Sequence, residues 1–201
     1  MMRRAALAVL LVAALCSSGI AYDACIVPDA SGLTPEDVSR LENLDTSRTR
    51  GLGAAMRADN AADRAVVAEL FEPGLAPVEP DLLVGTYQCR TIKMGNMLPL
   101  VVYQWFRCEI SATPAGFAIR KLTGSQNFSG TLMPAGSGYA YRGALSYGYE
   151  DDVTLYDTDA ARDQVGCLSA VTKGNRHFVL ELPFPKVESF HDVIELRPAG
   201  R

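Results

Sequence analysis

The chain has 201 residues, with 19 basic and 23 acidic side chains and a net charge of −4 at neutral pH. This acidic balance argues against a nucleic-acid partner, which would call for a basic surface. The length is enough for one domain, or one domain with an appendage, to bury a hydrophobic core without depending on disulfides or metals.

The first 21 residues have the pattern of a secretory signal peptide. Arg3 and Arg4 precede an apolar run, 5–15, that is too short to span a bilayer. The small residues Gly19 and Ala21 predict cleavage after Ala21. We therefore expect a periplasmic or secreted protein with no transmembrane segment in its mature chain, which keeps 17 basic and 23 acidic side chains and a charge of −6.

The cysteines predict an oxidising compartment. Cys16 lies inside the predicted signal peptide, and Leu15 disfavours a lipid anchor there because it stands where a small residue should precede a lipidated cysteine. The mature chain keeps Cys25, Cys89, Cys108 and Cys167. An even number behind a signal peptide predicts two disulfides, for which four cysteines allow three pairings. The sequence contains no C-x-x-C, the usual spacing of zinc and thioredoxin-like redox sites.

Residues 22–83 are predicted to form an N-terminal helical region and a linker. Thr34 is suited to cap the first helix, and Pro35 suits its first turn. Apolar residues near helical spacing support the later helices, and a proline-rich linker follows them. Helices are expected at 33–44, 47–57 and 60–71.

From Val84 the hydrophobic pattern changes from helical to alternating, which predicts strands. Strands are expected at 84–94, 99–110, 116–122, 128–133, 138–146, 164–172, 176–182 and 189–197. No segment of helix length separates them, so parallel crossovers are excluded and the strands form an antiparallel meander. Such a meander has exposed edges unless it closes. We expect residues 84–198 to form an up-and-down, lipocalin-like β-barrel of about eight strands, mainly β and α+β overall, with a two-sheet sandwich as the alternative.

Cys89 and Cys108 lie near the outer ends of two strand-like runs, and we expect them to form a structural disulfide that contributes about 3 kcal/mol. If they are directly opposed, Arg90 faces Arg107. Two opposed arginines repel each other unless a negative group lies beside them. Glu109, one position along the strand, is one candidate for that group.

A bound anion is the other candidate. Paired guanidinium groups at Arg90 and Arg107, beside Tyr103 and Trp105, offer bidentate donors and flat apolar walls to a carboxylate or phosphate. These four residues are therefore the predicted ligand-binding site.

If the hairpin disulfide forms, the second bridge joins Cys25 to Cys167 and ties the N-terminal leader to a late strand. This pairing rests on the even number of cysteines alone.

Two further patterns have weaker chemical readings. Ser146 lies in Ala-Leu-Ser-Tyr-Gly, a variant of the hydrolase nucleophile elbow, and His177 and His191 follow it in the chain order of α/β-hydrolases. The chain has too few predicted helices for that fold. The acidic stretch 149–163 offers oxygen ligands to calcium but lacks the glycine and terminal glutamate of an EF-hand loop, which favours a solvated loop. We predict no metal site and no cofactor.

Four ordered motifs resemble those of a known family: Cys-Arg-Thr-Ile-Lys at 89–93, Val-Val-Tyr-Gln-Trp-Phe-Arg-Cys at 101–108, Lys-Leu-Thr-Gly-Ser-Gln at 121–126 and Glu-Ser-Phe-His-Asp-Val-Ile-Glu-Leu at 188–196. They resemble the domain of unknown function 4893 family, small exported bacterial proteins with no assigned activity. The resemblance implies an exported bacterial protein, hence a periplasmic one, whose hairpin cysteines belong to the family's pattern. It implies no activity.

These patterns lead us to expect a non-enzymatic exported protein that binds a small apolar or anionic ligand inside a β-barrel. Barrels of about eight strands either fill with side chains or hold one small ligand. A filled barrel would instead indicate a structural module, or one that interacts with a periplasmic protein. A serine hydrolase that uses Ser146 is the second alternative.

Overall fold

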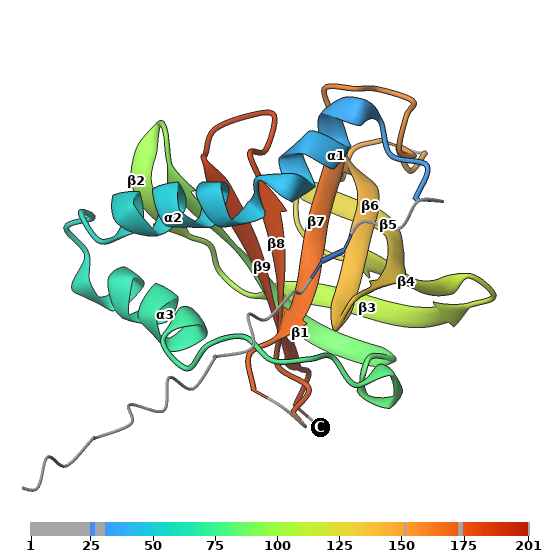
Figure 1. The fold of residues 1–201 in the computed structure, drawn as a ribbon, viewed down its shortest axis with the longest axis horizontal. Helices are drawn as coiled ribbons and strands as arrows, with labels where there is room; N and C mark the ends of the chain where they lie inside the picture. Colours follow the sequence, from blue (N-terminus) through green and yellow to red (C-terminus); the bar gives the residue numbers. More distant parts are fainter. Residues whose placement is uncertain (1–24, 27–30, 151, 173–174, 201) are drawn as a thin grey trace, which may run out of the picture.

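The computed structural model describes residues 25–26, 31–150, 152–172 and 175–200, and the predicted signal peptide lies outside them. Within this part of the chain the helices are α1 (Pro35–Glu42), α2 (Leu44–Ala55), α3 (Ala61–Phe71) and the short 3₁₀ helix η1 (Pro80–Leu82). The strands are β1 (Gly85–Gly95), β2 (Leu98–Val102), β3 (Phe106–Thr113), β4 (Gly116–Lys121), β5 (Gln126–Ala135), β6 (Gly138–Tyr147), β7 (Asp163–Ala170), β8 (Phe178–Pro183) and β9 (His191–Pro198). Figure 1 shows the helices on the outside of the curved sheet.

The sheet closes on itself because β1 has partners on both sides. One edge of β1 pairs antiparallel with β9, from Tyr87 opposite Pro198 to Met94 opposite His191. The other edge pairs first with β3 and then with β2, which follow each other along it. Since β2 and β3 together occupy one position around the sheet, the result is a closed eight-stranded barrel in which neighbouring strands are antiparallel. The prediction of an up-and-down barrel preceded by helices is confirmed.

One half of the barrel interior is filled with side chains. We call the end where β1 begins the closed end and the end where β1 stops the open end. The inward side chains toward the closed end are large and buried: Tyr87, Ile110, Ile119, Leu132, Tyr141, Leu168, Phe178, Leu180 and Leu196. Tyr141 needs two glycines beside it, because a Cβ on Gly143 would lie 2.2 Å from its hydroxyl oxygen and a Cβ on Gly130 2.5 Å from its ring.

The helices cover the outer face of one side of the barrel, where α1 contacts β7 and α2 contacts β1, β8 and β9 (Figure 1). Thr34 and Asn60 cap the starts of α1 and α3 through side-chain oxygens that accept backbone N–H groups. α2 packs so closely that a Cβ on Gly51 would lie 2.7 Å from the Cβ of His191. A second apolar cluster fills this interface, with Ala55, Val67, Leu70, Ile92, Met94, Leu100, Val171, Val179 and Val193. In the part of the chain that is described, no helix has both the length and the apolar character needed to cross a membrane.

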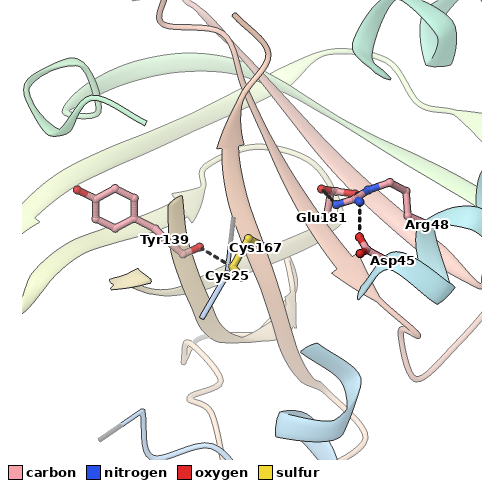
Figure 2. Close-up of a disulfide and its surroundings, with 6 residues drawn as sticks. All are labelled: Cys25, Asp45, Arg48, Tyr139, Cys167 and Glu181. Atoms are coloured by element: carbon pink, nitrogen blue, oxygen red, sulfur yellow. Dashed lines mark hydrogen bonds and ion pairs between the residues drawn. A yellow bond between two sulfur atoms is a disulfide. The ribbon is translucent and has the colours of Figure 1, made fainter. Parts of the chain in front are cut away.

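Both predicted disulfides are present. Cys89 and Cys108 join β1 to β3, with their Cα atoms 5.8 Å apart. Cys25 and Cys167 join the N-terminal segment to the outer face of β7, and Figure 2 shows this bond beside Tyr139 of β6.

The predicted hairpin register is wrong by two residues. Cys108 lies opposite Tyr87, and Arg107 lies opposite Gln88, so the disulfide runs diagonally and Arg90 does not face Arg107. The turn after β1 is tight, with Gly95 and Asn96 both at positive φ, and a register shift at Met94–Gly95 and another between β2 and β3 then set the pairing of β1 with β3. The directly opposed cysteines would have required a wider loop.

We predict that the longer of the two disulfide loops contributes more to stability. The chain-entropy model gives about 3 kcal/mol for the Cys89–Cys108 bond and about 5 kcal/mol for the Cys25–Cys167 bond, which span 19 and 142 positions of the sequence. Guanidinium chloride unfolding of the two double alanine variants measures both losses. A smaller loss for the Cys25–Cys167 variant would show that the leader is held by other contacts.

Candidate functional site

A cavity of about 220 Å³ opens at the open end of the barrel. We call it the mouth cavity; its lining includes Lys93, Tyr103, Phe106, Lys121, Gln164 and Asp192. On β1, β4, β7 and β9 the inward position nearest the open end is polar, whereas apolar residues occupy inward positions deeper in the barrel. Because side chains alternate between the two faces of a strand, this placement follows from the register of each strand. The filled half of the barrel therefore forms the floor of the cavity.

Lys93 on β1 is neutralised by two acids. Its Nζ lies 2.6 Å from Oε2 of Glu188, in the β8–β9 connection, and 3.9 Å from Oδ2 of Asp192. Burial would lower the pKa of Lys93, but the charges of Asp192 and Glu188 outweigh burial and raise it. Lys93 is therefore a fixed cation whose charge is already paired.

Asp192 on β9 is the buried acid of the cavity. Burial raises its pKa to about 6, although the charge of Lys93 and a hydrogen bond donated by Ser189 Oγ both act to lower it. The usual pKa of an aspartate is near 4, so this carboxyl gains a proton in mildly acidic solution rather than in strong acid.

Among the residues that the structure describes, Lys121 on β4 has no acidic partner. Its Nζ donates a hydrogen bond of 2.7 Å to the backbone oxygen of Gln126 and lies 3.9 Å from the centre of the Phe106 ring. Among the described residues no carboxylate lies within 4.0 Å of this nitrogen. Burial lowers the pKa of Lys121 to about 8. A partly buried ammonium group without an acid beside it is the charge that an anionic ligand would neutralise.

A second hollow of about 190 Å³ adjoins the mouth cavity. Lys93 and Asp192 line both spaces, so their side chains lie between them. The outer hollow is also lined by Arg40, Arg162 and Lys186, each of which pairs with an acid, and by Asp163 and Glu188. A ligand longer than the mouth cavity would extend into this charged hollow.

The predicted ligand-binding residues are dispersed. Arg90 and Trp105 do come together, with the guanidinium carbon 4.4 Å from the ring centre on the outer wall. Tyr103 instead lines the mouth cavity, and Arg107 is exposed on the outer side of β3. Anion binding by these four residues stays a prediction, and only Tyr103 belongs to the cavity described above.

A buried glutamate, rather than Glu109, neutralises Arg90. Oε2 of Glu195 lies 2.6 Å from Nε of Arg90, while its other oxygen contacts His177 and Arg197 at 2.8 Å and 2.6 Å. Burial acts to raise the pKa of Glu195, but hydrogen bonds from His177 and Arg90 outweigh it and lower that pKa. Glu109 pairs with Arg120 instead, at 2.7 Å. The negative charge that the sequence called for beside Arg90 is thus supplied from β9.

A second buried glutamate fastens α2 to the barrel. Both oxygens of Glu181 bind Arg48, at 2.6 Å and 2.8 Å, and Figure 2 shows this pair across the helix–sheet interface. His191 Nε2 lies 3.1 Å from Glu181, and Ser47 Oγ lies 2.9 Å from His191 Nδ1. This order resembles a serine-hydrolase triad, but all three side chains are fully buried, which leaves a substrate no access. The cluster is therefore structural.

As far as the structure describes the chain, neither Ser146 nor the acidic stretch 149–163 has the neighbours that its suggested chemistry, ester hydrolysis or calcium binding, would need. Ser146 faces Asn127 across the β5–β6 pair, while the hydrogen bonds of His177 and His191 described above go to other residues. Within the described ranges, no group of three or more His, Cys, Asp or Glu side chains is placed to hold a metal ion. Arg162 pairs with Glu150 at 2.7 Å and so neutralises one of the carboxylates of the acidic loop.

The family model for Domain of unknown function (DUF4893) matches residues 31–196, and the chain belongs to this family. The match covers all three helices and nearly all of the barrel, so the barrel is the fold of this domain. No curated protein and no solved structure matches the chain significantly. The family carries no assigned activity, so function must be argued from the site itself.

The corrected register predicts different roles for two neighbouring arginines. Arg90→Ala would remove one cation from buried Glu195, which keeps His177 and Arg197, and would lower the free energy of unfolding by about 3 kcal/mol. Arg107→Ala removes an exposed side chain and should change it by no more than about 0.5 kcal/mol. Chemical denaturation of both variants measures the difference. Equal losses would contradict the placement of Arg90 beside Glu195.

Proposed function

We propose that this protein is exported and binds a small amphipathic acid in the mouth cavity. The observation that carries the proposal is the ammonium group of Lys121, which contacts no acid in the described part of the chain. Phe106, Phe128 and Leu145 supply apolar walls for the rest of the ligand, and Tyr103 supplies an aromatic one. Apolar walls with a few polar groups that fix orientation are typical of small-molecule sites.

The size of the cavity limits the ligand. At about 30 Å³ per molecule of liquid water, 220 Å³ corresponds to roughly seven waters. Ligand pockets commonly span about 300–1,000 Å³, so the site suits a small molecule or one end of a longer one. The adjoining hollow offers room for that longer part.

Export is supported by the two disulfides and by the N-terminal pattern that precedes them. Disulfides form and persist in oxidising compartments and are rare in the cytosol. The family resemblance adds the expectation of a bacterial periplasm. A binding protein of this kind would meet its ligand outside the cytoplasmic membrane.

A protein partner is the second candidate. The loops at the open end expose large apolar side chains, with Met97 74 %, Tyr149 80 % and Leu155 65 % accessible. Apolar side chains at the rim of a barrel would suit a contact with another protein. The first candidate would be favoured if a small acid saturates the mouth cavity and the protein does not associate with a second protein chain.

Binding of straight-chain carboxylates tests the proposal. We expect calorimetric titration with acetate, butanoate, hexanoate and octanoate to show affinity rising about fourfold per added methylene, or about 0.8 kcal/mol, until the cavity is full. Lys121→Gln should abolish this binding because it removes the unpaired cation. The matched control is Arg107→Gln, which removes one positive charge from the outer wall and should leave affinity unchanged. Affinity that is independent of chain length, or unaffected in Lys121→Gln, would exclude the mouth cavity.

The same titration should depend on pH in two steps. As pH falls through about 6, Asp192 gains its proton and loses its negative charge, so carboxylate affinity should rise. As pH rises through about 8, Lys121 loses its proton and its charge, so affinity should fall. Other charges facing Asp192 come from Lys93, Glu188 and His191.

Two variants separate these steps. Asp192→Asn should remove the change near pH 6 and leave the change near pH 8. Lys121→Arg should bind as well at pH 9 as it does at pH 7, because a guanidinium group keeps its charge throughout this range. A fall in affinity near pH 8 that persists in Lys121→Arg would assign that step to another group.

A further inference from the structure

Lys121 has the surroundings of a nucleophilic amine rather than those of a structural lysine. The chain contains four lysines, of which Lys93 and Lys186 pair with Glu188 and Glu36. Lys121 faces the mouth cavity, where its nitrogen contacts an aromatic ring and a backbone oxygen instead of a carboxylate. Partial removal of an amine from water, with no acid beside it to hold the proton, activates a lysine as a nucleophile.

The protonation state of Lys121 also distinguishes it from a structural, ion-paired lysine. With its pKa lowered to about 8, roughly a tenth of this amine is neutral at pH 7, against less than about 0.1 % for an ordinary lysine. The neutral form is the nucleophile. Lys93 has the opposite tendency, because its two acids hold it in the charged form.

We infer that Lys121 captures the carbonyl carbon of a small 2-oxo acid or aldehyde as a reversible imine. The inference rests on the proposed function, since it takes the mouth cavity as the ligand site, and it names the class of ligand. Nζ attacks the carbonyl carbon as the C=O π bond breaks toward oxygen, and one proton passes from the nitrogen to that oxygen to give a carbinolamine. The hydroxyl group takes up a second proton from solvent and leaves as water while the nitrogen lone pair forms the C=N bond; the protonated imine returns a proton to solvent when it becomes neutral. One amine and one carbonyl group thus give one imine and one water, with no change of oxidation state.

A 2-oxo acid satisfies both the charge and the reactivity of the site. When the imine is protonated, the positive charge stays on the nitrogen of Lys121, close to the carboxylate of the bound acid. The ion pair of the proposed function is therefore kept after the covalent bond forms. Phe106 and Leu145 remain free to cover the apolar part of the ligand.

Reductive trapping tests the inference in the wild-type protein. The full exported chain is incubated at pH 7 with pyruvate and sodium cyanoborohydride, which reduces an imine to a stable secondary amine, and each lysine is then read by peptide mass spectrometry. Propanal, a carbonyl compound without an acid, and propanoate, an acid without a carbonyl group, give the comparison arms. We expect Lys121 to be labelled at least about tenfold faster than Lys186, after allowing for the lower basicity of its amine. Propanoate should slow labelling by pyruvate, and unfolding in urea should remove the preference.

The outcomes distinguish this inference from the proposed function. Equal labelling of Lys121 and Lys186 would overturn the imine. If propanoate nevertheless binds to the wild-type protein in a calorimeter, the cavity remains an acid-binding site and only the covalent step is lost. If neither labelling nor propanoate binding occurs, both proposals fail. Faster labelling of Lys93 than of Lys121 would also overturn the inference, because the ion pairs of Lys93 should suppress it.

Discussion

Closure of the sheet through β1 is the constraint on which the rest of the structure depends. Without the pairing of β1 with β9, the strands between them would keep their neighbours, but the sheet would have two open edges and no interior. Closure encloses the inward side chains of all strands, so every second residue must fit a limited volume. Toward the closed end that volume is taken up by aromatic and aliphatic side chains, with Gly130 and Gly143 giving space to Tyr141. Toward the open end the inward residues of β1, β4, β7 and β9 become polar, and the volume is left as a cavity.

The buried charges of the protein divide into two kinds. Glu181 and Glu195 point to the outer wall, where Arg48 and Arg90 pair with them and bind α2 and neighbouring strands to the barrel. A buried carboxylate without a partner is strongly destabilising. Because Glu181 and Glu195 are both paired with arginines, their role is to hold elements of the fold together. The mouth cavity is different because its charges are not all paired: Lys93 contacts both Glu188 and Asp192, whereas Lys121 contacts no acid among the described residues. This unpaired ammonium group, rather than the cavity volume, sets the chemistry that the site can recognise.

Local sequence patterns were sufficient for much of the fold. The alternating apolar pattern beyond residue 84 predicted the strands, and the even number of cysteines predicted the disulfides. The hairpin register was not predictable in this way, because it depends on a tight turn at Gly95 and Asn96. The partner of Arg90 was also inaccessible, since Glu195 lies 105 residues further along the chain and meets it only when the barrel closes.

The candidate site was missed for the same reason. Lys93, Lys121 and Asp192 stand on three strands that are brought together only by closure, and each looks like a solvent-exposed residue in its own segment. One signal was available: Lys121 follows the inward residue Ile119 by two positions, so its side chain points into the barrel once the strand is assigned. Tyr103 was predicted as part of a site and does line the mouth cavity, whereas Arg90, Trp105 and Arg107 do not.

Native mass spectrometry of the protein recovered from the cells that naturally make it tests the central claim most directly. The account predicts that the wild-type chain carries one small acidic molecule, which is released on denaturation and is absent from Lys121→Gln isolated in parallel. A wild-type chain that carries no such molecule, even when small carboxylates are added back, would contradict it. The same complement of bound molecules on both proteins would contradict it as well, because Lys121 would then have no part in binding.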